Sequence, residues 1–188
     1  YLNTNARYMA EPGGLVTEET PMAAGGSLYS TTKSLAEHAI LQAGGVSLRL
    51  ASVFGAAPAF RRETLLNWFV YSAVKFGKLV LFDADAVRDV VHVQDVVRAI
   101  VHVMKNYSVM KGEAYNVGLT SMTKKQMCER IKAQMHGFIW TDSGRVGVDP
   151  DKRDFYVIYD RINSTGFEAA WSLDEGITEL IKAVQLLD

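Results

Sequence analysis

The chain alternates between short apolar runs and longer stretches in which apolar residues recur at helical spacing. This spacing predicts helices at 27–43, 64–76, 96–105, 123–135, 160–164 and 173–187. Compact apolar or β-branched runs predict strands at 1–4, 46–53, 78–82, 90–93, 113–117 and 138–140. The expected N-caps are Ser27, Asp95 and Thr123, and glycines end the first two long helices at 44–45 and 77. Such an alternation predicts an α/β fold with a substantially parallel sheet.

Composition narrows the classes of function. With 48% hydrophobic and 22% charged residues, the 188-residue chain can form a core, which excludes wholesale disorder. The 20 Lys and Arg residues are balanced by 21 Asp and Glu residues, so no overall basic field favours nucleic acid. A lone cysteine, Cys128, excludes a disulfide framework, and no apolar run reaches the ~18 residues of a membrane span. We therefore expect a cytoplasmic protein without nucleic-acid or membrane partners.

The most informative local feature is Tyr29-x-x-x-Lys33 in the first predicted helix. Residues four apart share a helix face, so the phenol and the ammonium are expected to point into one cleft. A cation about 4 Å from a phenolate, at an effective dielectric of about 20, contributes roughly 4 kcal/mol. That attraction suits Tyr29 to exchange a proton with a substrate hydroxyl. A tyrosine one turn before a lysine is also common on exposed helices, so the pair alone leaves a structural role open.

Thr4, at the end of the preceding strand, could supply a second hydroxyl to the same substrate oxygen. The order Thr4, Tyr8, Tyr29, Lys33 resembles the Ser/Thr–Tyr–Lys arrangement of extended short-chain dehydrogenases/reductases, the NAD-dependent nucleotide-sugar epimerase/dehydratase family. Further segments resemble motifs of that family in the same order along the chain: 16–21 (VTEETP), 48–55 (LRLASVFG), 88–96 (RDVVHVQDV), 115–118 (YNVG), and 166–167 with 171–177 (GF and WSLDEGI).

The resemblance implies a catalytic centre and a cofactor. Tyr29 would be the acid/base, and Thr4 would share the hydrogen bond to the sugar oxygen. Lys33 would hold the nicotinamide ribose and favour the deprotonated phenol, while Ser52 would lie at the cofactor site in place of the family's Asn. The implied cofactor is NAD, with NADP not excluded, and hydride would pass between its nicotinamide and a sugar carbon.

The resemblance also implies anchors for a nucleotide-diphosphate sugar. Arg88 would bind the diphosphate, since a guanidinium suits bidentate phosphate contacts; the alternative is an ion pair with Asp85 or Asp89. Arg153 would be a second anchor, or else an exposed loop charge. Asn67 would turn toward the nucleotide, or else be a hydrogen-bonded core amide.

The four histidines give no metal site by their spacing, and His92 is interpreted as structural because the resembling motif places it at a strand end. Some residues depart from the family pattern. Asn5 and Ala6 stand where nucleotide-sugar 4,6-dehydratases carry an Asp-Glu pair, so dehydration is disfavoured. Ala56 replaces the usual Pro and Arg7 a small apolar residue, which warns against assuming a familiar substrate.

No Gly-rich dinucleotide-binding turn occurs in the sequence. We therefore expect the C-terminal part of a Rossmann-like doubly wound parallel sheet plus a small α/β substrate-binding subdomain. Residues 1–110 would carry the Tyr/Lys helix, with substrate-domain insertions near 56–90, and 111–188 would mainly bind the sugar nucleotide. The isolated chain is expected to show no turnover, because half of the cofactor site would be missing.

The expected function is NAD-dependent epimerisation of a nucleotide-diphosphate sugar through a transient keto intermediate. An NADPH-dependent 4-keto-sugar reductase and a catalytically incompetent fragment or binding relative are the alternatives. The resemblance also implies a homodimer that packs the Tyr-bearing helix and its neighbour into a four-helix bundle.

Overall fold

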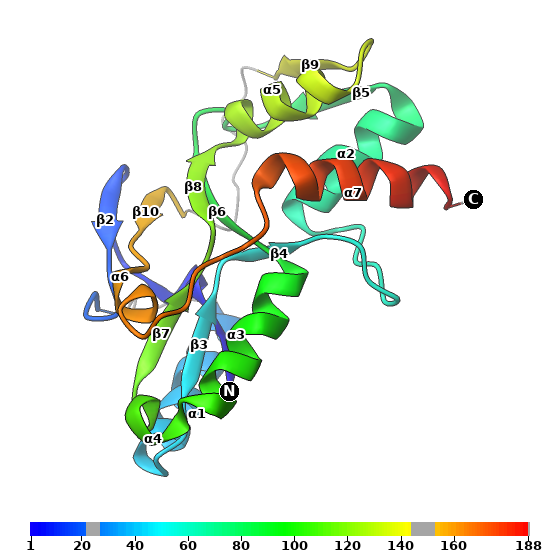
Figure 1. Cartoon of the computed structure of the whole chain (residues 1–188). Helices are drawn as coiled ribbons and strands as arrows, with labels where there is room; N and C mark the ends of the chain where they lie inside the picture. The colour runs from blue at the N-terminus through cyan, green and yellow to red at the C-terminus, as the bar shows by residue number, and fades with distance from the viewer. Residues whose placement is uncertain (22–26, 144–152, 188) are drawn as a thin grey trace.

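Strands β1 (Leu2–Thr4), β3 (Ser47–Leu50) and β7 (Ala114–Val117) form a parallel sheet in the spatial order β1-β3-β7 (Figure 1). The structure is a computed structural model that describes residues 1–21, 27–143 and 153–187. Helix α1 (Leu28–Gln42) packs on β1 and β3, and the one-turn 3-10 helix η1 (Asn5–Arg7) follows β1. The sheet thus delivers the end of β1 and the start of α1 to one side of the molecule.

The chain leaves this sheet after β3 and enters a second one. Strand β4 (Ser52–Phe54) pairs in parallel with β6 (Val87–His92), which pairs antiparallel with β8 (Thr120–Thr123). The predicted single strand at 46–53 is therefore wrong. Ala51 donates its N–H to Val117 O at 2.9 Å, and the backbone then changes partner from β7 to β6. The sequence reads as one apolar run across this break because β3 and β4 are both buried or half-buried.

Two further parallel pairs lie outside these sheets. Strand β2 (Gly14–Val16) pairs with β10 (Phe155–Val157), and β5 (Lys78–Leu81) pairs with β9 (Ile139–Asp142). The sequence pattern predicted β5 and β9 but not β2, β8 or β10.

The long helices lie close to their predicted positions: α2 (Leu65–Phe76), α3 (Val93–Lys105), α5 (Lys124–Gln134) and α7 (Leu173–Gln185). The short helices are α4 (Tyr107–Met110) and α6 (Asp160–Asn163). Ser27 and Thr123 are confirmed as N-caps, each accepting a backbone N–H, and Gly77 ends α2 at φ +66°. The predicted Asp95 cap is wrong. His92 caps α3, and buried Asp95 instead accepts the backbone N–H groups of Ala170 and Trp171.

Two hydrophobic clusters account for most of the core. One packs α3 and the segment around Phe167 against the first sheet, and the other fills the space between α2, α5 and α7. Both draw residues from before and after position 110, and β7 carries the first sheet to Val117. No helix within the described residues is long and apolar enough to span a membrane.

Candidate active site

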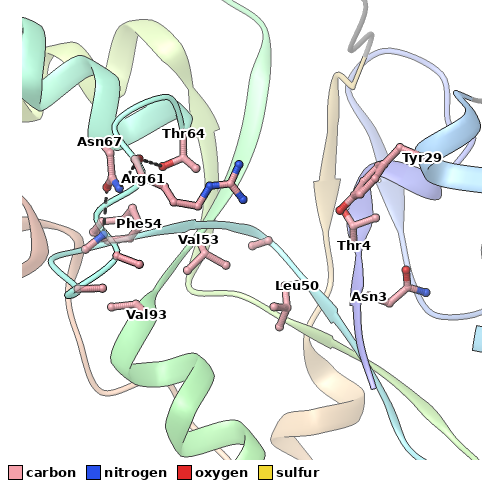
Figure 2. A pocket seen from close by; sticks show the side chains of 14 residues that line it. Asn3, Thr4, Tyr29, Leu50, Val53, Phe54, Arg61, Thr64, Asn67 and Val93 are labelled. Atoms are coloured by element: carbon pink, nitrogen blue, oxygen red, sulfur yellow. Dashed lines mark hydrogen bonds between the residues drawn. The ribbon is translucent and has the colours of Figure 1, made fainter. Parts of the chain in front are cut away.

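Thr4 and Tyr29 line one pocket of about 310 Å³, at the end of β1 and the start of α1. Figure 2 shows the phenol of Tyr29 reaching toward Thr4. Tyr29 is 55% exposed, so an incoming ligand can reach its ring. The Thr4 Oγ accepts the N–H of Ala6 at 3.1 Å as the N-cap of η1, which fixes the orientation of the hydroxyl. The sequence-predicted pair is thus brought to one cavity.

Lys33 does not line this pocket, although it is half-buried one helical turn after Tyr29 on the same side of α1. Its Nζ donates to Leu2 O at 3.0 Å and lies 5.9 Å from the centroid of the Tyr29 ring. The same ammonium is 5.1 Å from the centroid of the Tyr1 ring. The helix spacing therefore places the two side chains together, but only the phenol faces the cavity.

The opposite wall of the pocket comes from β4 and the loop that leads to α2, including Phe54, Gly55 and Arg61. Buried Asn67 holds this loop at two points: its Oδ1 accepts the N–H of Gly55 at 3.1 Å, and its Nδ2 donates to Arg61 O at 3.0 Å. Asn67 lines the pocket, but both ends of its amide contact backbone. These contacts match the interpretation as a hydrogen-bonded amide.

A second pocket, of about 350 Å³, collects the cationic side chains Arg88, Lys124 and Arg153. The guanidinium of Arg88 donates to Val87 O at 2.9 Å and to the carbonyl oxygen of Arg153, which draws β6 and the segment before β10 together. Lys124 Nζ donates to Phe82 O at 2.9 Å. Ser52, predicted at the cofactor site, lines this cationic pocket and not the one that contains Tyr29.

The two pockets adjoin, because Val53 and Thr64 line both. Thr4 and Tyr29 line the first pocket together with Arg61, whereas Arg88, Lys124 and Arg153 line the second together with Glu63. We refer to the two adjoining pockets as the groove, with a hydroxyl end at Thr4 and Tyr29 and a cationic end at Arg88, Lys124 and Arg153. Lys124 is a groove residue that the sequence reasoning missed. It is the first residue of α5, and its only sequence signal was its place after the Thr123 cap.

Beneath the Tyr29 helix lies a buried polar cluster centred on Glu37. Its carboxylate contacts the guanidinium groups of Arg7 and Arg49, and accepts hydrogen bonds from Asn3 at 2.6 Å and Ser47 at 2.7 Å. Burial and the neighbouring Arg49 lower the pKa of Arg7 to about 10. The cluster anchors α1 to β1 and β3, and so fixes the helix that carries Tyr29.

Arg7, noted as a departure from the resembling motif, belongs to this cluster. Glu37 and Arg49 were not predicted. The sequence signal for this cluster is Glu37 itself, an acidic residue one turn after Lys33 on the face of α1 that turns toward the sheet.

The profile of the NAD dependent epimerase/dehydratase family matches residues 1–118. Similar solved structures include ADP-L-glycero-D-manno-heptose-6-epimerase of Helicobacter pylori, at TM-score 0.83 and 18% identity, covering 100% of this chain and 60% of that protein. The dTDP-glucose 4,6-dehydratase of Bacillus anthracis, in complex with NAD, gives TM-score 0.78 and 24% identity, with coverage of 100% and 61%. UDP-glucose 4-epimerase of Thermotoga maritima, with UDP-glucose, gives 0.79 and 22%, with coverage of 98% and 62%.

At these identities the structural similarity establishes the fold. The predicted α/β, Rossmann-like class is confirmed. The chain spans about three fifths of the length of each of these proteins.

Proposed function

Because the chain belongs to the NAD-dependent epimerase/dehydratase family, we propose that it supplies the proton-transfer and sugar-nucleotide part of an enzyme that epimerises a nucleotide-diphosphate sugar with NAD. The observation that carries this proposal is the groove. Tyr29 and Thr4 stand at one end of it, and Arg88, Lys124 and Arg153 stand at the other. A nucleotide-diphosphate sugar has the matching layout, with a neutral polyol joined to a dianionic linker.

The hydroxyl end of the groove suits proton transfer at a sugar oxygen. Tyr29 takes the proton of the sugar hydroxyl and returns it when the ketone is reduced. The Thr4 oxygen accepts from Ala6 and keeps its own hydrogen to donate to the same sugar oxygen. The positive charge of Lys33 favours the phenolate form of Tyr29, which is the form that accepts the proton of the sugar hydroxyl.

Two features of α1 fit a nicotinamide cofactor: Tyr29 is accessible, and the Lys33 ammonium sits on a flexible stem with its bond to Leu2 O near the surface. Lys33 would exchange that bond for the ribose hydroxyls. NAD, when bound, supplies the acceptor and donor of hydride for the sugar carbon. The NAD and NADPH in similar structures support this class of cofactor.

The cationic end of the groove suits the diphosphate. Arg88 and Arg153 present guanidinium groups, whose planar fork matches phosphate oxygens, and Lys124 adds a point charge. Ser52 lies in the same pocket, so we assign its hydroxyl to the sugar-diphosphate side and not to the cofactor.

Epimerisation is favoured over dehydration by the residues after Thr4. Asn5 is buried and its Nδ2 donates to Asp89, so the side chain points into the protein, and Ala6 carries no ionisable group. Removal of water across C5 and C6 of the sugar needs an acid and a base beyond Tyr29. Epimerisation needs Thr4, Tyr29 and Lys33 together with the cofactor, but no further carboxylate.

We also propose a homodimer that uses the outer face of α1, where Leu28 and Leu35 are exposed. Analytical ultracentrifugation tests this assembly independently of the activity.

The test of the proposed function is Tyr29→Phe in the NAD-loaded enzyme that contains these 188 residues, with UDP-glucose as substrate. We expect kcat for conversion to the C4 epimer to fall about 10²–10⁴-fold, because the ring remains and only the transferable proton is lost. Tyr156→Phe, at an exposed tyrosine of β10 outside the groove, is the control. Undiminished conversion by Tyr29→Phe would sink the proposal, while net consumption of NADPH would identify a 4-keto reductase instead.

A further inference from the structure

His92 is fully buried at the end of β6 and lies between two different hydrogen-bonding groups. The Gln94 N–H donates to its Nδ1 at 3.3 Å, and its Nε2 lies 2.9 Å from Glu179 Oε2. Because Nδ1 accepts, the ring hydrogen is on Nε2 and is donated to the Glu179 carboxylate. The ring stacks on Trp171, with centroids 4.0 Å apart and an interplanar angle of 16°.

The same oxygen of Glu179 accepts a second hydrogen bond, from the N–H of Ala56 at 2.9 Å. Glu179 lies on α7, His92 at the end of β6, and Ala56 in the loop between β4 and α2 that forms a wall of the Tyr29 pocket. One carboxylate of the C-terminal helix therefore joins three segments that are distant in the sequence.

The contact between these segments is close enough to require glycine on both sides. Gly55 has φ +123°, and a Cβ there would lie 2.6 Å from His92 Nε2. On α7, a Cβ at Gly176 would lie 2.4 Å from Phe54 Cε2 and 3.0 Å from His92 Cδ2. The loop and the helix thus approach the imidazole as closely as backbone allows.

The loop has little means of ordering itself. Its sequence from 55 to 59 is Gly-Ala-Ala-Pro-Ala, and such small side chains bury little apolar surface, so its apolar anchorage comes from half-buried Phe60 near its far end. The residues before Phe60 are held by backbone hydrogen bonds to side chains of other elements: Gly55 N–H donates to Asn67 and Ala56 N–H to Glu179, while Asn67 also donates to Arg61 O beyond Phe60.

We propose that Glu179 is a positioning residue for the groove: with His92 as its buried support, it holds the 55–61 loop in the conformation that receives the sugar nucleotide. The effect on a sugar-nucleotide ligand rests on the proposed function, whereas the effect on the loop does not. Glu179 acts through Ala56 and touches no reacting atom.

The first experiment measures amide hydrogen exchange in the 188-residue chain by NMR. In Glu179→Ala the Ala56 amide should exchange at least about tenfold faster, because it loses a charged acceptor. Glu179→Gln keeps a carbonyl oxygen and should restore exchange to within about threefold of the unchanged protein. Lys182→Ala, at an exposed position of the same helix, is the matched control and should leave Ala56 unaffected. Unchanged exchange at Ala56 in Glu179→Ala overturns the proposal.

Two measurements on the unsubstituted chain keep the test decisive if Glu179→Ala fails to fold. The ¹⁵N shifts of His92 should report a neutral ring with hydrogen on Nε2, and the Ala56 amide should be protected. A hydrogen on Nδ1, or an Ala56 amide that exchanges as fast as an unstructured peptide, overturns the proposal.

The second experiment is titration calorimetry with UDP-glucose on the same chains. Glu179→Ala should weaken binding about threefold to tenfold, with Glu179→Gln close to the unsubstituted protein. An unchanged affinity together with a faster Ala56 exchange would show that the loop position is irrelevant to the ligand, and overturns the positioning role. If UDP-glucose binds none of the chains, the proposed function fails, while the exchange and His92 measurements still decide whether Glu179 holds the loop.

Discussion

At the scale of single residues, the position of Tyr29 in the groove depends on the charge of Glu37, which lies outside the groove. The Glu37 carboxylate is almost completely buried, and it faces both Arg7 and Arg49 on the underside of α1. Removing water from these ions is costly, so the cluster contributes less to net stability than its contacts suggest. What it does provide is geometry, because any displacement of α1 would leave buried charges without partners. This constraint on α1 also fixes the position of Tyr29, which lies two turns before Glu37 on the same helix.

Substituting Glu37→Gln should therefore lower the free energy of unfolding by about 3–5 kcal/mol, since two buried guanidinium groups lose their anion. Urea denaturation of the 188-residue chain measures the loss. Glu113→Gln removes an exposed carboxylate that pairs with Arg161 at 3.3 Å, and should cost no more than about 1 kcal/mol. Equal effects at the two positions would contradict a constraining role for the buried cluster.

Cys128 gives a second prediction at this scale, from its titration. Burial, with a smaller contribution from Glu129, raises the pKa of its thiol to about 12. An unfolded thiol ionises near pH ~8.5, so the folded state holds the proton more tightly. The contribution of this residue to stability is therefore complete below about pH 8.5 and is lost progressively toward pH 12.

Urea denaturation at pH 8 and pH 10 should accordingly show a larger alkaline loss of stability for the unsubstituted chain than for Cys128→Ala. Native Cys128 should also react slowly with iodoacetamide at pH 8, and rapidly once urea unfolds the chain. An equal alkaline loss in both proteins would place the thiol in a less buried environment than the structure gives it.

At the scale of elements, two threonines occupy the same N-cap position on different helices, but only one of them forms a side-chain hydrogen bond to its helix. Thr123 forms a reciprocal capping box with Gln126 at the start of α5, whereas Thr64 begins α2 without a side-chain cap bond. Thr123→Ala should cost about 1 kcal/mol of unfolding free energy, and Thr64→Ala less than half as much. Thermal and urea denaturation of the pair measure the difference, and equal losses would contradict the capping account.

The same element scale shows what a single sequence could predict. The long helices were predicted to within a few residues, because periodicity and caps are local signals that span several turns. Strands β2 and β10 have three residues each, too few for an alternating pattern to register. The sequence pattern does not reveal the division between β3 and β4, because two successive buried strands form one continuous apolar run whichever sheet each of them joins. The local pattern predicts a cap at Asp95, and it cannot show that the carboxylate binds the distant backbone N–H groups of Ala170 and Trp171 instead.

At the scale of the whole molecule, the family was identified correctly from ordered motifs, while the assembly of its residues was not fully predictable. Thr4 and Tyr29 share a pocket as expected, but Ser52 falls on the far side of the break at Ala51, beside Arg88. Lys124 and Glu179 reach the groove region from α5 and α7, and no resembling motif marked either one. The order of the motifs indicates which functional residues the chain contains. Which of these residues lie together depends on the path of the chain through its sheets.

Lys124 makes that distinction measurable, because its neighbour Lys125 carries the same charge and is exposed. If the groove binds a diphosphate, Lys124→Gln should weaken UDP-glucose binding about tenfold, since a charged hydrogen bond contributes roughly 1.5–3 kcal/mol. Lys125→Gln, with the same change in net charge, should alter affinity less than about twofold at physiological salt, where surface charges are screened within roughly 8 Å. Calorimetry on both chains decides between them. Equal losses would mean that the overall charge of the protein, and not the position of Lys124 in the groove, attracts the ligand.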